Sequence, residues 1–180
     1  MTDGVMSDQH GIRETAPADL PEIAALYAEA FPGEELMPLV RELLAESGGV
    51  LSLAAIHGSA LIGHAVFTAC GLDAAEDGIA LVGPLAVAVS WQRRGVGTAL
   101  LHAALRRLEE AGVEQACVLG DPAYYGRLGF VAETGIRPPY ALPAQWEGAW
   151  QSLQLAAAGR PRQGVLRVPS PWRRPVLWAP

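Results

Sequence analysis

Apolar residues in the first quarter of the chain recur at helical spacing. Over residues 19–30, and again over residues 34–46, they return every three or four positions with charged residues between them. The Pro32-Gly33 pair interrupts this pattern, and the Gly48-Gly49 pair ends it. We expect two amphipathic helices here, the first running to about residue 30 and the second covering residues 34–46.

Apolar runs without helical spacing flank these helices. Residues 11–15 can form a first strand, and residues 50–56 and 61–72 are two longer apolar segments. Only four residues, among them Gly58, separate the two longer segments. A short glycine-containing connection of this kind is typical of a β-hairpin, which we therefore predict for residues 50–72.

The clearest pattern lies in the middle of the chain. An apolar run over residues 81–89 meets a short polar and basic turn, residues 90–94, and Gly95 and Gly97 then open a strongly periodic helix. Residues 115–119 form the next compact apolar run. The order strand, helix, strand predicts a βαβ crossover between parallel strands.

The remaining third of the chain is richer in proline and less regular. Asp121 and Pro122 are typical of the first turn of a short helix, and a strand is expected to start near Gly129. Two further strands are predicted over residues 150–155 and 164–168. The last twelve residues hold two tryptophans among four prolines, and the pattern leaves open whether they dock on the domain.

The length of 180 residues is that of one domain. We expect a disordered N-terminus over residues 1–10, a folded domain over residues 11–158, and a C-terminal extension over residues 159–180. No apolar run is long enough to span a membrane, and the first ten residues lack a signal-peptide pattern. These features predict a soluble, cytoplasmic protein with no membrane partner.

Charge is unevenly distributed. All 13 basic residues are arginine; residues 1–80 hold two of them and 13 acids, whereas residues 81–180 hold 11 arginines and six acids. The overall net charge of −6 disfavours nonspecific binding to nucleic acid, which needs a basic surface. The acidic first half weakly favours a cationic partner through its field, although solvated helix faces account for most of those acids.

The cysteines and histidines give no metal-binding pattern. Cys70 and Cys117 lie 47 residues apart with no CxxC motif, and the four histidines are scattered. We expect two buried reduced thiols and no metal site.

The glycines at the start of the central helix indicate a phosphate site, because the first N–H groups of a helix lack partners and the helix dipole favours anions there. A nucleoside-triphosphate loop requires a lysine, and the chain contains none. A dinucleotide fingerprint requires a third glycine, where this chain has Leu100. A third kind of phosphate-binding loop with glycines before a helix is the pyrophosphate loop of enzymes that use coenzyme A (CoA).

Gln92-Arg93-Arg94-Gly95-Val96-Gly97 fits that loop, and here the sequence resembles the GNAT N-acetyltransferase superfamily. The setting strengthens the match: Leu85-Ala86-Val87 precedes the loop, Trp91 occupies a usually aromatic position, and Thr98 follows the second glycine. After a further interval, residues 125–130 read YGRLGF, similar to the family's YxxxGF signature. The resemblance covers about residues 11–133, and the segment 118–130 is similar to a bacterial branch of predicted N-acetyltransferases. Val89 and Arg93 stand where many relatives have proline and glycine.

The resemblance implies an α/β fold of the GNAT type, with a mixed sheet of about six to seven strands flanked by helices. It implies that acetyl-CoA is the co-substrate, that backbone groups near Leu85, Ala86 and Val87 pair with its pantetheine arm, and that the loop binds its pyrophosphate. The loop residues are Gln92, Arg93, Arg94, Gly95, Val96, Gly97 and Thr98. The Gly83-Pro84 pair within the strand indicates a bulge or an edge, or else a plain irregularity, because proline cannot donate to the ladder.

Tyr125 falls on the tyrosine of the family signature, and we take it as the acid that protonates the departing thiolate. Tyr124 beside it is the alternative acid, and a packing role is the alternative function. The sequence does not single out a base. Candidates are Glu34, Glu35, Asp73, Glu76, Asp77, Asp121 and His64, although His64 fits a satisfied core histidine and Asp121 a helix cap.

Three functions remain open at this point. The first is direct acetyl transfer from acetyl-CoA to a primary amine of a small molecule or peptide. The second is a degenerate GNAT domain that binds or senses acyl-CoA, and the third is a dinucleotide-dependent redox enzyme. Relatives often dimerise through late strands, so residues 146–155 are a candidate homodimer surface.

Overall fold

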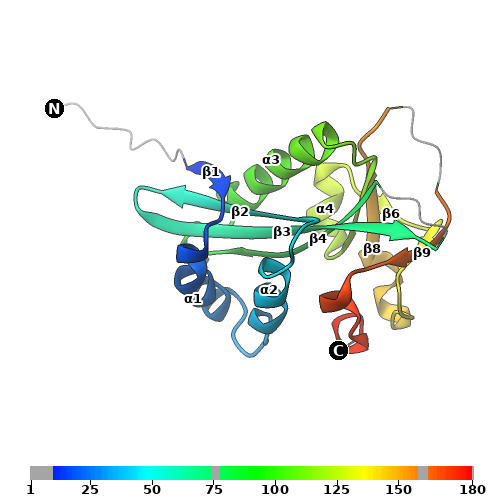
Figure 1. The fold of residues 1–180 in the computed structure, drawn as a ribbon, viewed down its shortest axis with the longest axis horizontal. Helices are drawn as coiled ribbons and strands as arrows, with labels where there is room; N and C mark the ends of the chain where they lie inside the picture. Colours follow the sequence, from blue (N-terminus) through cyan, green and yellow to red (C-terminus); the bar gives the residue numbers. More distant parts are fainter. Residues whose placement is uncertain (1–9, 74–77, 158–161, 180) are drawn as a thin grey trace.

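The computed structural model describes residues 10–73, 78–157 and 162–179, which form a mixed β-sheet with helices on both faces (Figure 1). The strands of this part are β1 (Gly11–Glu14), β2 (Val50–His57), β3 (Ala60–Leu72), β4 (Ile79–Val87), β5 (Gln115–Leu119), β6 (Val131–Ala132), β7 (Ile136–Arg137), β8 (Trp150–Gln154) and β9 (Gly164–Arg167). The α-helices are α1 (Leu20–Ala30), α2 (Met37–Leu44), α3 (Val96–Glu110) and α4 (Pro122–Tyr125). The expected disorder of residues 1–10 falls almost wholly outside the described residues, as does the expected domain boundary after residue 158.

Seven strands follow one another across the main sheet in the order β1-β2-β3-β4-β5-β8-β6. β9 pairs with the far end of β3, and β7 pairs with β9. β4 and β5 are parallel and are joined by α3, whereas the other neighbours in the main sheet are antiparallel. The predicted mixed sheet, the β2–β3 hairpin and the βαβ crossover are confirmed.

The helices cover the sheet in two layers because their apolar stripes face it. α3 buries its leucines, among them Leu100, Leu101 and Leu108, against one face of the sheet, and α1 and α2 cover the other (Figure 1). Successive strand residues serve opposite layers, so that Leu53 packs on the α3 side and Ala54 on the α1 side. None of the helices in the described part of the chain is long and apolar enough to cross a bilayer.

Two predicted boundaries are wrong. The helix expected over residues 34–46 covers only Met37–Leu44, because the N–H of Glu34 closes a turn on the Phe31 carbonyl and Pro38 lies in the first helical turn, a position that suits proline. The strand expected to reach Val89 ends at Val87. The exposed Val89 instead donates its N–H to Glu29 Oε1 at 2.9 Å.

β4 is irregular at the Gly83-Pro84 pair, as expected. Between the pairs Phe67↔Val82 and Ala65↔Leu85, two residues of β4 oppose the single Val66 of β3, which defines a bulge. The parallel ladder to β5 also ends at Val82. From the bulge onward, β4 therefore keeps its ladder to β3 but not its ladder to β5.

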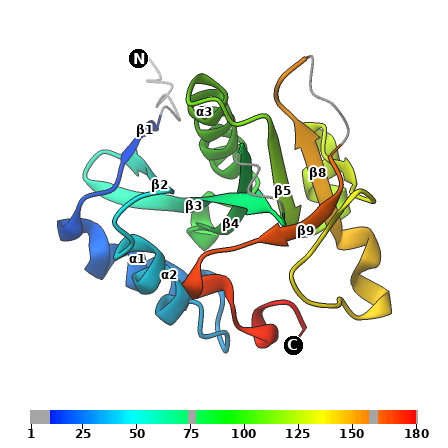
Figure 2. The ribbon, with the colours of Figure 1, turned by 45° about the vertical axis from the view of Figure 1, so that its right-hand side comes forward.

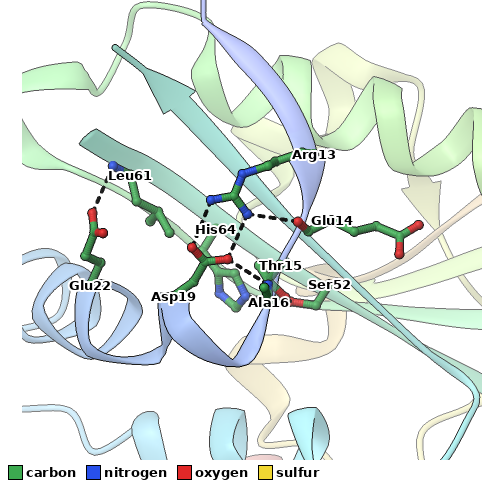
Figure 3. Close-up of polar contacts among 9 residues, drawn as sticks. All are labelled: Arg13, Glu14, Thr15, Ala16, Asp19, Glu22, Ser52, Leu61 and His64. Atoms are coloured by element: carbon green, nitrogen blue, oxygen red, sulfur yellow. Dashed lines mark hydrogen bonds and ion pairs between the residues drawn. The ribbon is translucent and has the colours of Figure 1, made fainter. Parts of the chain in front are cut away.

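A buried polar chain links Thr15, which follows β1, to β2, β3 and α1. Figure 3 shows its members Thr15, Ser52 and His64. The His64 ring is fully buried, with Nδ1 3.1 Å from the Tyr27 hydroxyl and Nε2 2.8 Å from Ser52 Oγ, which also accepts a hydrogen bond from Thr15. Burial lowers the pKa of His64 to about 4. A neutral ring that accepts from Tyr27 and donates to Ser52 satisfies both nitrogens, so His64 is a satisfied core histidine.

An ion pair beside that chain holds the start of α1. Arg13 donates two hydrogen bonds to Asp19, at 2.7 and 2.8 Å, and Asp19 also accepts from the Ala16 N–H (Figure 3). The bonds from Arg13 and then from Ala16 lower the pKa of Asp19 to about 2. These contacts tie β1 to the turn before α1.

The last residues of the described chain dock on the sheet beside α2 (Figure 2). Trp172 and Trp178 are buried together with Leu39 and Leu43 of α2. The indole of Trp172 donates to Thr68 Oγ1 at 3.1 Å, and that of Trp178 donates to the Trp172 carbonyl at 3.1 Å. The question that the sequence left open is thus answered, and this segment belongs to the core.

Candidate active site

The turn after β4 exposes the N-terminus of α3. A short 3-10 turn over Val89–Trp91 is followed by Arg93 and Gly95 in left-handed conformations, with φ of 59° and 84°, and α3 begins at Val96. The first N–H groups of a helix have no intrahelical partner, so this end of α3 carries free donors and a positive partial charge. Residues 95–98 line a cavity of about 760 Å³, which we call the loop cavity.

Glycine is required at the two loop positions for different physical reasons. Gly95 is the N-cap of α3 at positive φ, where an L side chain is strained, and the space around its Cα is open. Gly97 is helical, but a Cβ there would lie 2.5 Å from the Tyr124 hydroxyl oxygen. Gly95 therefore shapes the turn, and Gly97 makes room for a tyrosine at the cavity wall.

The edge of β4 beyond the bulge faces the same cavity. Ala88 donates its N–H to the Ile62 carbonyl opposite it, so alternate pairs such as Ala86↔His64 also carry the hydrogen bonds to β3. The backbone groups of Leu85 and Val87 then point away from β3, and both residues line the loop cavity. Ala86 turns its backbone toward β3 and its side chain into the core beneath α1.

The turn is braced by stacking and by one amide. Trp91 lies between the His57 ring, with centroids 4.6 Å apart, and the Arg94 guanidinium, 4.5 Å from the Trp91 ring centre. Gln92 donates from Nε2 to the Val87 carbonyl at 3.1 Å. Trp91, Gln92 and Arg93 line the loop cavity, whereas Arg94 stacks on Trp91 beside it.

Two adjacent tyrosines on α4 close the far side of the cavity. Asp121 caps α4 by accepting from the Ala123 N–H at 2.9 Å, as expected, and so orients Tyr124 and Tyr125. Burial raises the pKa of Tyr124, although its hydrogen bond to Thr98 opposes the shift. Burial raises the pKa of Tyr125 well above its usual range, so its hydroxyl stays protonated at neutral pH. Gly120 leaves the space that the Tyr125 ring fills.

Tyr125 also faces a second, smaller cavity. This cavity of about 240 Å³, which we call the bulge cavity, lies beside residues 81–85 of β4 at the place where the ladder to β5 ends. Tyr125, Leu85 and Phe31 line both cavities. The bulge cavity is completed by Leu36, Leu39, Leu119, Trp172, Leu177 and Trp178.

The bulge cavity contains residues that the sequence pattern did not indicate as part of a site. Phe31 follows the last turn of α1, and Trp172, Leu177 and Trp178 come from the tail, at least 40 residues after the tyrosine pair. The only signal in the sequence was two tryptophans in a proline-rich tail. That signal predicts burial but gives no position.

None of the candidate bases that the structure describes lines the bulge cavity. Glu34 and Glu35 are exposed, His64 is buried in its own hydrogen-bonded chain, and Asp73 accepts from the Val165 N–H at 3.0 Å. Asp121 caps α4 and lines the loop cavity. Glu76 and Asp77 lie outside the described residues. Cys70 and Cys117 are separate buried thiols, and burial raises the pKa of Cys70 to about 12.

Two solved structures are similar to this chain in fold. The crystal structure of the GNAT family N-acetyltransferase YhbS from Escherichia coli in complex with CoA matches with a TM-score of 0.82 at 28% identity, covering 92% of this chain and 93% of YhbS. A GNAT family acetyltransferase from Brucella melitensis in complex with acetyl-CoA matches with a TM-score of 0.73 at 26% identity, covering 91% and 98%. The fold is that of the GNAT class of acetyltransferases.

Sequence comparison identifies the family to which the chain belongs. Residues 20–130 match the model of the acetyltransferase (GNAT) family. The chain is similar to the uncharacterized N-acetyltransferase YjhQ of Escherichia coli K12, at 29% identity over 164 residues, which span 87% of this chain and 91% of YjhQ. It is 30% identical over 147 residues to YhbS from the same strain, spanning 80% and 84%. This chain therefore belongs to the GNAT family.

Proposed function

We propose that this chain moves the acetyl group of acetyl-CoA directly to a primary amine of a small molecule or peptide. The observation that carries the proposal is the position of Tyr125, which lines both the loop cavity and the bulge cavity. An acid at the junction of a donor site and an acceptor site can act on the leaving group without moving.

The donor site in this proposal is the loop cavity. The N–H groups at the start of α3 and the Arg93 side chain are placed to hold the pyrophosphate of CoA. The outward backbone groups of Leu85 and the outward N–H of Val87 offer the hydrogen bonds of a missing strand to the amide groups of the pantetheine arm. Gln92 and Arg94 hold the turn in shape through Val87 and Trp91.

The proposed transfer needs one acid, which protonates the sulfur, and releases one proton from the amine. The amine nitrogen forms a bond to the acetyl carbon, the bond between that carbon and sulfur breaks, and the sulfur takes a proton from the Tyr125 hydroxyl. The nitrogen releases one proton to water, and Tyr125 regains its own from solvent. Tyr125 enters each cycle protonated and so has a proton to donate, and the burial that raises its pKa makes it a weaker acid than a free phenol.

Transfer of radiolabelled acetyl groups tests the proposal. The full chain is incubated with labelled acetyl-CoA and a panel of primary amines, and the expected result is an acetylated amine formed in step with free CoA. Heat protection by CoA serves as the control for donor binding. Tight CoA binding without transfer to any amine would contradict the proposal and identify the chain as an acyl-CoA-binding module.

A further inference from the structure

We infer that the tail segment 170–178 is a wall of the acceptor site, and that this wall selects a small primary amine with an apolar body. The inference rests on the proposed function and narrows its substrate class. It starts from the bulge cavity, where Trp172, Leu177 and Trp178 of the tail face Phe31, Leu36 and Leu39.

The tail segment lines the cavity with apolar atoms. The indole N–H groups of Trp172 and Trp178 are already used, by Thr68 Oγ1 and by the Trp172 carbonyl, each at 3.1 Å. The two rings lie against each other with centroids 6.0 Å apart, and Arg174 ties the segment to Glu42 of α2 at 3.0 Å. A fixed wall whose donors are occupied can offer a ligand apolar contact but no hydrogen bond from its indoles.

The lining of the cavity offers an ammonium ion aromatic faces but no carboxylate. No charged side chain lines it among the residues that the structure describes, and Tyr125 supplies a hydroxyl. The contact with aromatic faces offsets only part of the cost of moving an ammonium ion out of water, so a neutral amine enters more easily. The cavity itself thus favours the nucleophilic form of the amine, and the proposed transfer needs no base in this lining.

The size of the cavity limits the acceptor. Its volume is about 240 Å³, whereas a cavity of about 150 Å³ holds benzene and pockets for drug-sized ligands measure roughly 300–1,000 Å³. One ring or a branched alkyl group with a short arm to the amine fits this space. Polyamines need carboxylates and amino sugars need several polar side chains, and the described lining has neither. In this proposal the acidic first half of the chain therefore does not set the acceptor.

A matched set of amines tests the substrate class. We compare 2-phenylethylamine and isoamylamine with spermidine and glucosamine, and expect kcat/KM to be at least about tenfold higher for the two apolar amines. Between pH 6 and 8, their kcat/KM should rise about tenfold per unit as the neutral fraction of the amine grows. Preference for spermidine or glucosamine would overturn the inference while leaving the proposed function intact.

Two neighbouring tail residues test the wall itself. Leu177 is half-buried and lines the cavity, whereas Val176 is 68% exposed and does not. We expect Leu177→Asp to lower kcat/KM for 2-phenylethylamine at least about tenfold with an unchanged KM for acetyl-CoA, and Val176→Asp to leave both unchanged. Equal behaviour of the two variants would overturn the inference.

Two further measurements keep the test decisive. Leu36→Asp places the same charge on the opposite wall, should Leu177→Asp fail to fold. Calorimetric binding of 2-phenylethylamine to the CoA-loaded chain does not depend on turnover. If the parent chain binds 2-phenylethylamine but transfers no acetyl group, and Leu177→Asp abolishes the binding, the result would support the wall and contradict the proposed function. If the parent chain shows neither binding nor transfer, both would be overturned.

Discussion

The loop cavity and the bulge cavity share a wall but are built differently. More than half of the residues that line the loop cavity come from one segment, residues 85–98, and the others from residues 30–31 and 121–128. The bulge cavity is assembled from four segments, residues 31–39, 81–85, 119–125 and 172–178. The loop cavity includes a helix N-terminus and charged side chains, whereas the side chains of the bulge cavity are aliphatic and aromatic.

This difference predicts how each cavity responds to change. A cavity lined by backbone groups tolerates side-chain replacement unless the replacement disturbs φ or a close approach, as at Gly95 and Gly97. A cavity lined by side chains changes its selectivity with a single residue. Donor binding and acceptor choice should therefore be separable by mutation, with Tyr125 as the residue that belongs to both.

Tyr125→Phe should have the largest effect, because it removes the proposed acid while the ring keeps its contacts with Gly120 and Phe130. We expect kcat to fall by roughly 10- to 1,000-fold with nearly unchanged affinity for acetyl-CoA. Steady-state kinetics with calorimetric CoA binding measures both. Tyr124→Phe is the matched control, and a larger loss of kcat in that variant would transfer the role of acid to Tyr124.

Acid should lower the free energy of unfolding through the buried His64. Burial holds the pKa of His64 near 4, below its usual value of about 6.5, so the unfolded chain binds more protons between these pH values. The free energy of unfolding should therefore fall by up to about 3 kcal/mol from pH 6.5 to 4. Asp19, with its pKa lowered to about 2, adds its own loss only below about pH 4.

Urea unfolding at a series of pH values measures this loss. His64→Gln should flatten the pH dependence between 6.5 and 4, although it also lowers stability at pH 7.5 by breaking the contacts with Tyr27 and Ser52. His102→Gln, at an exposed position on α3, should keep the full dependence. An unchanged slope in His64→Gln would show that another group is responsible.

Gly95→Ala should separate the loop cavity from the bulge cavity. A Cβ at φ 84° costs about 1–2 kcal/mol, and relaxing that strain moves the turn. We expect CoA to bind about tenfold more weakly, with the preference among amines unchanged. Gly126→Ala is the control, because its φ is −59° and no atom lies within 4 Å of the added Cβ. Equal CoA affinity in the two variants would argue against the backbone turn as the donor site.

Trp172→Phe should have the smallest effect, confined to the bulge cavity. It removes the hydrogen bond to Thr68, so we expect the free energy of unfolding to fall by about 1 kcal/mol while CoA affinity is unchanged. Thermal unfolding with and without CoA gives both values. Arg174→Gln, which breaks an exposed ion pair with Glu42 and a partly exposed hydrogen bond to the Pro171 carbonyl, should cost less. A larger loss in Arg174→Gln would mean that the ion pair, rather than the indole, anchors the tail.

Much of the fold could be read from periodicity because those elements are set locally. The apolar spacing of α3, the hairpin connection at Gly58 and the cap at Asp121 each use residues within a few positions of one another. The late start of α2 follows from a local turn that the apolar spacing does not reveal, whereas the early end of β4 depends on a distant group. Glu29 binds the backbone of Val89 and the strand ends early, although the two residues are 60 positions apart.

The sequence by itself determined where the proposed donor site lies. The glycine turn, the preceding strand and the tyrosine pair lie within about 45 residues; local spacing indicated an anion-binding turn, and the resemblance to the GNAT family supplied acetyl-CoA as its ligand. Only the tertiary structure decided the acceptor side, because the bulge cavity depends on which apolar side chains meet across the fold. An apolar run indicates that its residues are buried, but it does not identify the residues that they pack against.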